Sequence, residues 1–140
     1  MTPFSGRCVF FTLDTPQALD HYTRGLGFAV DWVHEEQGRP FVAQVSLYGL
    51  QIILNQVEPG TQSRPGHGRV FIGLDDAQTA TLLRHVQKQG ITMTYAHWGQ
   101  PTAVITDLDQ NELYIWLSDT ERAKWQAAHT APPNPSLKRS

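Results

Sequence analysis

An internal repeat restricts the fold of this chain more than any other feature of its sequence. Corresponding residues recur 62 or 63 positions apart within similar strand and helix patterns: Arg7 and Arg69, Asp14 and Asp76, Gly27 and Gly90. A repeat of this length is a supersecondary unit that buries its apolar face only against a neighbour. We therefore expect two copies of one unit to share a single core within the 140 residues.

Each copy is predicted to contain one strand, one helix and three further strands. In the first copy, the apolar segment 7–13 precedes Asp14, a typical N-cap residue, and Pro16 suits the first helical turn. The helix is expected to end at the glycines on either side of Leu26. Three segments rich in strand-forming residues follow it: FAVDWVHEE, FVAQVSLYG and LQIILNQV.

The second copy repeats this order after the segment EPGTQSRPGHG, whose proline and glycine content predicts a linker loop. It runs from the strand RVFIGL through the helix DDAQTATLLRHVQKQG to the strands ITMTYAHW, QPTAVITDLD and NELYIWLS. Ser118 and Glu121 then form the start of a capping box, which predicts a short terminal helix before a disordered tail.

These elements predict an α+β fold made of two tandem βαβββ modules, at about residues 5–58 and 67–118. The modules are expected to form a cupped, mixed eight-stranded sheet with the helices on its outer face. Residues 1–118 would then form the domain, and residues 119–140 the terminal helix and the tail.

The composition excludes several classes of protein. The 11 Lys and Arg residues are balanced by 13 Asp and Glu residues without a long run of either sign, which argues against nucleic-acid binding. Cys8 is the single cysteine, so an internal disulfide and a C-x-x-C zinc or redox site are excluded. No apolar segment approaches the roughly 20 residues that cross a bilayer, and the first residues do not resemble a signal peptide. We therefore expect a cytoplasmic protein without a membrane partner.

The period of two in a strand predicts which side chains face the concave side of the sheet. When Arg7 is placed on that side, the same count adds these residues: Val9, Phe11, Arg69, Phe71, Gly73, Tyr114 and Trp116. The alternate positions of the last strand, Leu113, Ile115 and Leu117, are uniformly apolar and are expected to face the core.

Three local signatures coincide with the repeat. They are DTPQALDHYTRGLGF, with Tyr22, Leu26, Gly27 and Phe28; GRVFIGLDD; and HWGQPTAVITDLDQN, with Trp98, Gly99 and the spacing Asp107, Asp109, Asn111. Over about residues 5–118 they resemble the vicinal oxygen chelate (glyoxalase/bleomycin-resistance/dioxygenase) superfamily, and most closely its bleomycin-resistance-type members.

The turn after Asp107 departs from the family pattern at Leu108 and Gln110, where proline and glycine are usual. Two shapes are open to it. Either Gln110 adopts a left-handed conformation, at a cost of about 1 kcal/mol, or the turn takes a different form.

The resemblance implies four metal-ligand positions, in the first and last strands of each half. Their counterparts here are Arg7, Arg69, Tyr114, and either Ile53 or Leu54. A guanidinium stays protonated and has no lone pair to donate, so we expect neither a metal nor another cofactor. The alternative is a shifted metal site that uses His67 and Glu112.

A concave face with aromatic walls and two guanidiniums suits an aromatic ligand that carries a carboxylate or a similar oxyanion. The candidate ligand-binding residues are Arg7, Phe11, Trp32, Arg69, Phe71, Tyr95, His97, Trp98, Tyr114 and Trp116, and none is assigned as catalytic. Alternatively, Arg7 and Arg69 lie at the rim and pair with carboxylates such as Glu35 or Glu112. The aromatic residues near Tyr95 would equally suit a dimer interface.

Three functional hypotheses follow. The first is a metal-independent protein that binds and sequesters a small drug or toxin, as the resemblance to bleomycin-resistance-type members implies. The second is a lyase, an isomerase or a ring-cleaving dioxygenase with a non-standard site, in which His97 or Tyr114 could act as the acid–base group. The third is a regulatory or interaction module with a vestigial pocket. The resemblance also implies a homodimer.

Overall fold

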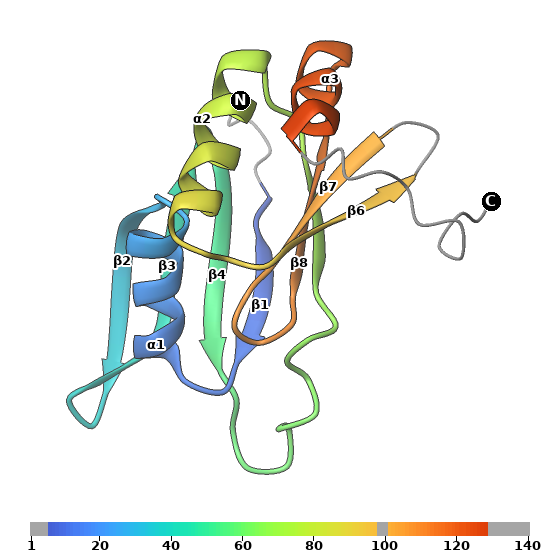
Figure 1. Cartoon of the computed structure of the whole chain (residues 1–140). Helices are drawn as coiled ribbons and strands as arrows, with labels where there is room; N and C mark the ends of the chain where they lie inside the picture. The colour runs from blue at the N-terminus through green and yellow to red at the C-terminus, as the bar shows by residue number, and fades with distance from the viewer. Residues whose placement is uncertain (1–5, 98–100, 129–140) are drawn as a thin grey trace, which may run out of the picture.

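The repeat in the sequence corresponds to two four-stranded sheets built on the same plan (Figure 1). The computed structural model describes residues 6–97 and 101–128. The first module contains β1 (Cys8–Thr12), α1 (Thr15–Asp20), the π-helical turn η1 (His21–Gly25), β2 (Ala29–Glu36), β3 (Arg39–Leu47) and β4 (Leu50–Gln56). Its strand order is β1-β4-β3-β2, with β1 parallel to β4 and the other neighbours antiparallel.

The second module repeats this topology with the strand order β5-β8-β7-β6. It contains β5 (Arg69–Ile72), α2 (Asp76–Lys88), β6 (Met93–His97), β7 (Pro101–Thr106) and β8 (Glu112–Trp116), and α3 (Asp119–Ala128) follows. The predicted α+β class and the tandem βαβββ modules are therefore confirmed. The eight strands are divided between two hydrogen-bonded sheets, and α1 and α2 lie on the same side of them (Figure 1).

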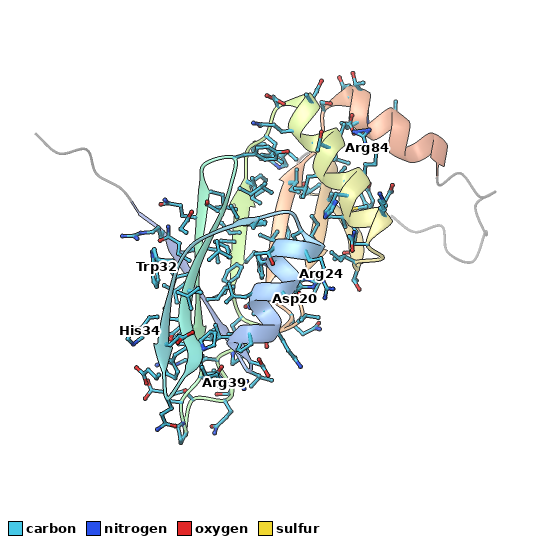
Figure 2. All side chains as sticks on the ribbon, turned by 90° about the vertical axis from the view of Figure 1, so that its left-hand side faces the viewer. Asp20, Arg24, Trp32, His34, Arg39 and Arg84 are labelled. Atoms are coloured by element: carbon cyan, nitrogen blue, oxygen red, sulfur yellow. The ribbon has the colours of Figure 1, made fainter. Side chains whose placement is uncertain are left out.

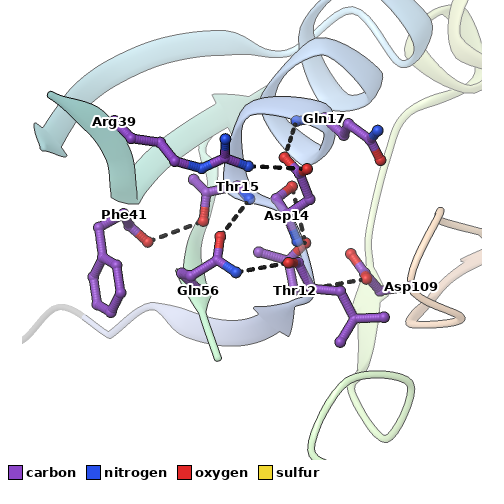
Figure 3. A network of polar contacts seen from close by, with 9 residues as sticks. Thr12, Asp14, Thr15, Gln17, Arg39, Phe41, Gln56 and Asp109 are labelled. Carbon is purple, nitrogen blue, oxygen red and sulfur yellow. Dashed lines mark hydrogen bonds and ion pairs between the residues drawn. The ribbon is translucent and has the colours of Figure 1, made fainter. Parts of the chain in front are cut away.

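A polar network fixes the start of the first helix (Figure 3). The carboxylate of Asp14 accepts a hydrogen bond from the Gln17 N–H at 3.0 Å, as expected for an N-cap, and forms an ion pair with Arg39 of β3 at 3.0 Å. The side chain of Gln56, at the end of β4, donates to the Leu13 carbonyl at 2.6 Å. The cap therefore joins α1 to two strands of its own sheet.

The core lies on the helix side of both sheets, and its composition confirms the predicted strand phase. The alternate residues Phe10, Ile52, Leu54, Ile72, Leu113, Ile115 and Leu117 are buried together with Ala18, Tyr22, Leu82, Leu83 and Val86 from the helical segments. This single cluster joins both modules, as expected for a repeat that cannot bury its apolar face alone. Within the described residues, no helix is long and apolar enough to cross a membrane.

The turn between β7 and β8 is organised by the carboxylate of Asp107. Its Oδ1 atom accepts hydrogen bonds from the backbone N–H groups of Asp109 and Asn111, at 2.8 and 2.9 Å. Gln110 has a φ of 74°, so the left-handed form of this turn is the one adopted. Oδ2 of Asp107 accepts a further bond, 2.7 Å long, from the buried hydroxyl of Tyr22 in η1.

The same turn also contacts the first strand and the linker. The side chain of Asn111 is buried; its Oδ1 accepts from the N–H groups of Gly66 and Gly68, and its Nδ2 donates to the Phe11 carbonyl. Asp109 accepts from the Leu13 N–H at 3.0 Å, as Figure 3 shows. The turn is thus the polar junction between the two modules.

We expect Tyr22→Phe to lower the free energy of unfolding by about 1 to 3 kcal/mol at pH 7, because a buried carboxylate loses a hydrogen-bond donor. Burial raises the pKa of Asp107, whereas the bond from Tyr22 lowers it, so the variant should raise this pKa further. When the pKa of a carboxyl group is higher in the folded than in the unfolded state, the folded protein becomes less stable as the pH rises. The difference between variant and wild type should therefore shrink as the pH falls.

Urea denaturation at several pH values measures this difference. Tyr48→Phe is the matched control. Because the Tyr48 side chain is exposed, this substitution should change the free energy of unfolding little. Equal stability of the Tyr22→Phe variant and the wild type at neutral pH would contradict a structural role for this bond.

Candidate functional site

The face of the two sheets opposite the core exposes aromatic and charged side chains. In β1, Val9 is exposed and Phe11 is partly exposed, whereas the alternate residue Phe10 is buried. In the second sheet, Phe71 and Trp116 lie on this face with 37% and 49% of their surface exposed. We call this the concave face.

Three aromatic residues of the second sheet lie together on this face. The rings of Phe71 and Trp116 meet edge to face, with centroids 4.6 Å apart, and the Phe71 centroid lies 6.4 Å from that of Tyr114. The ladder positions that pair β5 with β8 bring Phe71 opposite Tyr114. We call Phe71, Tyr114 and Trp116 the aromatic cluster.

Charged groups continue the same ladder beside the cluster. Arg69 Nε forms an ion pair with Glu112 Oε1 at 3.1 Å, and the guanidinium carbon lies 4.9 Å from the centre of the Tyr114 ring. The Tyr114 hydroxyl donates to the same Glu112 oxygen at 3.2 Å. Burial and the Glu112 carboxylate raise the pKa of Tyr114, and Arg69 partly opposes this. Arg69 is therefore paired with Glu112, in agreement with the alternative interpretation of the sequence, in which this arginine pairs with a carboxylate.

The first sheet holds its arginine differently. Arg7 donates to the Gln44 side chain at 2.8 Å, and Gln44 in turn donates to the Asp31 carboxylate at 2.7 Å. Gln44 is buried, although it lies on the concave side of β3. Arg7 is thus linked through an amide to a carboxylate. Trp32, on β2, is exposed and pairs with Gln44 in the sheet register (Figure 2).

The aromatic residues predicted around position 97 do not form part of the described concave face. Tyr95 packs against the core, opposite Ala103 of β7. Burial raises the pKa of its hydroxyl, and the Glu121 carboxylate adds to this effect. Trp98 lies outside the described residues, and of His97 only the backbone, at the end of β6, is described. Their roles in ligand binding stay predictions.

A pocket of about 460 Å³ lies where the linker crosses the end of β1. Among the predicted binding residues whose side chains are described, only Phe11 lines this pocket. Its lining is Val9, Phe10, Phe11, Ser63, Arg64, His67, Gly68 and Asn111. Val9 and Phe11 are the concave-side residues of β1, so part of the pocket's lining belongs to the concave face. The sequence analysis did not predict Ser63 and Arg64 as binding residues, because the periodicity on which it relied does not extend into a loop.

The linker residues are held in place by backbone contacts. A turn closed by the bond from the Thr61 N–H to the Glu58 carbonyl begins the segment, and Asn111 fixes its end through Gly66 and Gly68. A Cβ atom at Gly68 would lie 2.5 Å from the Phe10 ring, so only glycine permits this close approach. Between these two anchors, the Arg64 guanidinium lies 4.9 Å from the centre of the Phe11 ring.

The residues at the metal positions that the resemblance implied do not fit a divalent cation. Two of them are arginines, whose guanidiniums cannot coordinate a metal. The third, Tyr114, has its hydroxyl bonded to Glu112, and the fourth is an aliphatic residue at Ile53 or Leu54. Glu112 is paired with Arg69, so a shifted site would have to break this ion pair. Within the described residues, no group of three or more His, Cys, Asp or Glu side chains could hold a metal.

Solved structures with the same fold include proteins of several origins. A bleomycin-binding protein from bleomycin-producing Streptomyces verticillus, complexed with copper(II)-bleomycin, is 18% identical, with a TM-score of 0.60 over 85% of this chain and 100% of that chain. TnmS3, an antibiotic binding protein from Streptomyces sp. CB03234, is 20% identical, with a TM-score of 0.59 over 83% and 98%.

An integron cassette protein from the mobile metagenome of V. cholerae is also 20% identical, with a TM-score of 0.56 over 82% of this chain and 96% of that chain. At these identities the likeness concerns the fold alone. A search of curated proteins finds no match to the chain.

The sequence itself matches the profile of one family over most of its length. The match covers residues 5–115, which include both modules and the junction turn at Asp107–Asn111. It agrees with the tandem βαβββ topology and with the signatures around Tyr22 and Asp107. This chain belongs to the Glyoxalase/Bleomycin resistance protein/Dioxygenase superfamily.

Proposed function

We propose that this protein binds a small aromatic molecule on its concave face without a metal, and that it acts by sequestering that molecule. The observation that carries the proposal is the exposed Phe71–Trp116 pair beside Tyr114. Exposed aromatic side chains gathered on one concave surface are typical of a ligand-binding site. The fold relatives that are named as bleomycin-binding and antibiotic binding proteins support the same class of function.

The electrostatics of the face favour sequestration over metal-dependent catalysis. Arg69 and Arg7 occupy positions that metal-dependent members use for ligands, and a guanidinium has no lone pair with which to coordinate a cation. Glu112 accepts bonds from both Arg69 and Tyr114, so its carboxylate is already used within the protein. We therefore propose that no resident cofactor takes part.

We further propose that the protein is a cytoplasmic homodimer in which the edge of the first sheet is covered by a second copy. All eight residues of β2 are exposed, and Val30 and Val33 expose 47% and 40% of their surface on its helix side. An exposed edge strand with apolar side chains on both faces is a site for association.

Sedimentation equilibrium should give twice the mass of the chain, because two copies pair through β2. The mass of a single chain at high concentration would contradict the dimer.

We expect Phe71→Ala to weaken the binding of phenylnaphthylamine, a neutral fluorescent probe with two aromatic ring systems. An aromatic contact is worth about 0.5 to 1.5 kcal/mol beyond the buried area, so the affinity should fall by about fivefold. The control is Leu108→Ala, which removes another exposed apolar side chain, from the β7–β8 turn. Equal losses in the two variants, or no binding by the wild type, would overturn the proposed function.

Protein purified without chelators or an affinity tag should contain less than one metal per chain, because arginines, which cannot coordinate a metal, stand at two of the metal positions. Adding zinc, nickel, manganese or iron should change neither the amount of metal bound per chain nor the melting temperature of the protein. One tightly bound metal per chain would contradict metal independence and would make His67 and Glu112 the first ligands to test.

A further inference from the structure

We propose that the linker pocket binds an anionic oxyacid group of the ligand through Arg64, with His67 as a second donor. The inference rests on the proposed function, because it concerns the other end of the same aromatic ligand. It also moves the anion site away from Arg7 and Arg69, the two arginines that the sequence suggested. The ligand would be an aromatic acid, whose oxyacid group is a carboxylate, a sulfonate or a phosphate.

The pairing of the arginines leads to this assignment. Arg69 is neutralised by Glu112 at 3.1 Å, and Arg7 is tied to Gln44, which bonds the Asp31 carboxylate. Arg64, by contrast, has no carboxylate partner among the described residues. The described residues that line the pocket include no Asp or Glu. An anion that enters this pocket therefore meets a guanidinium whose charge is not already compensated.

The geometry of Arg64 leaves its donors available to a ligand. Its guanidinium lies over the Phe11 ring at 4.9 Å, which is within the range of a cation–π contact. No described residue accepts a hydrogen bond from the Arg64 side chain, so its N–H groups can form two parallel bonds with an oxyanion. His67 lines the same pocket and can donate a hydrogen bond whether its imidazole is neutral or protonated.

The pocket is prepared for binding because the linker is anchored on both sides of Arg64. The turn at Glu58–Thr61 holds one side, and Asn111 holds the other through the N–H groups of Gly66 and Gly68. A site fixed before binding costs less ordering entropy when the ligand arrives. Its volume of about 460 Å³ falls within the range of small-molecule sites.

The pocket also lies close enough to the aromatic cluster for one ligand to contact both. Gly68 lines the pocket, and Phe71 follows it by three residues along β5, a separation of about 10 Å in an extended strand. Val9 and Phe11 provide apolar surface on the β1 side of the pocket. A ligand with two fused or linked rings and one terminal oxyacid group matches this arrangement.

A matched pair of fluorescent probes tests the assignment. Anilinonaphthalene sulfonate and phenylnaphthylamine share the same rings, but only the first carries an anionic group. The wild type should bind the sulfonate more tightly, and Arg64→Gln should weaken it by about tenfold while changing the neutral probe by less than about twofold. Arg64→Lys, which keeps the charge but loses the planar fork, should give an intermediate loss.

The control variant is Arg84→Gln, which removes an exposed charge from α2 on the other side of the sheets (Figure 2). It should leave both affinities unchanged, and a cooperative thermal transition in every variant excludes dye binding to partly unfolded protein. Equal effects of Arg64→Gln on the two probes, or a sulfonate-selective loss in Arg7→Gln or Arg69→Gln instead, would overturn the assignment while the proposed function stands. Binding of neither probe by the wild type would overturn both.

Discussion

The carboxylate of Asp107 is the interaction on which the arrangement of the two modules depends. One of its oxygens closes the β7–β8 turn, and the other receives the Tyr22 hydroxyl from the first module. The turn then places Asn111 where it bonds β1 and the linker together. A buried carboxylate is costly unless it is fully hydrogen-bonded. The position of the linker, and with it the shape of the pocket, therefore follows from satisfying one buried charge.

The distribution of positive charge separates the concave face into parts with different chemistry. Arg69 is paired with Glu112 and lies over Tyr114, so the ion pair and the ring form one continuous surface. Arg7 supports the first sheet through Gln44. Both arginines thus contribute mainly to the structure of the face. Arg64 comes from a loop and has no described carboxylate beside it, so its positive charge at the linker pocket is not compensated by a described residue.

The sequence predicted what depends on periodicity and missed what depends on loop conformation. The alternation in RCVFFTL and NELYIWLS correctly separated buried residues such as Phe10 and Ile115 from exposed ones such as Val9 and Trp116. The spacing of Asp107, Asp109 and Asn111 indicated a specific turn, but the residues it would hold lie 40 or more positions away. The composition of EPGTQSRPGHG does not place Arg64 over Phe11, because one of the two anchors of this segment, Asn111, is distant in sequence.

The exposure of the concave face also connects ligand binding with the proposed dimer. A pocket normally covers most of the surface of a small ligand, whereas the aromatic cluster leaves Phe71 and Trp116 open on one side. If the second copy that docks on β2 also extends over this face, it would bury those rings and the far side of a bound ligand at once. Water would then be excluded from the oxyanion as well, and a lower local dielectric strengthens its attraction to a guanidinium. Dimerisation and affinity for an anionic ligand would in that case be thermodynamically linked, since each stabilises the same closed arrangement.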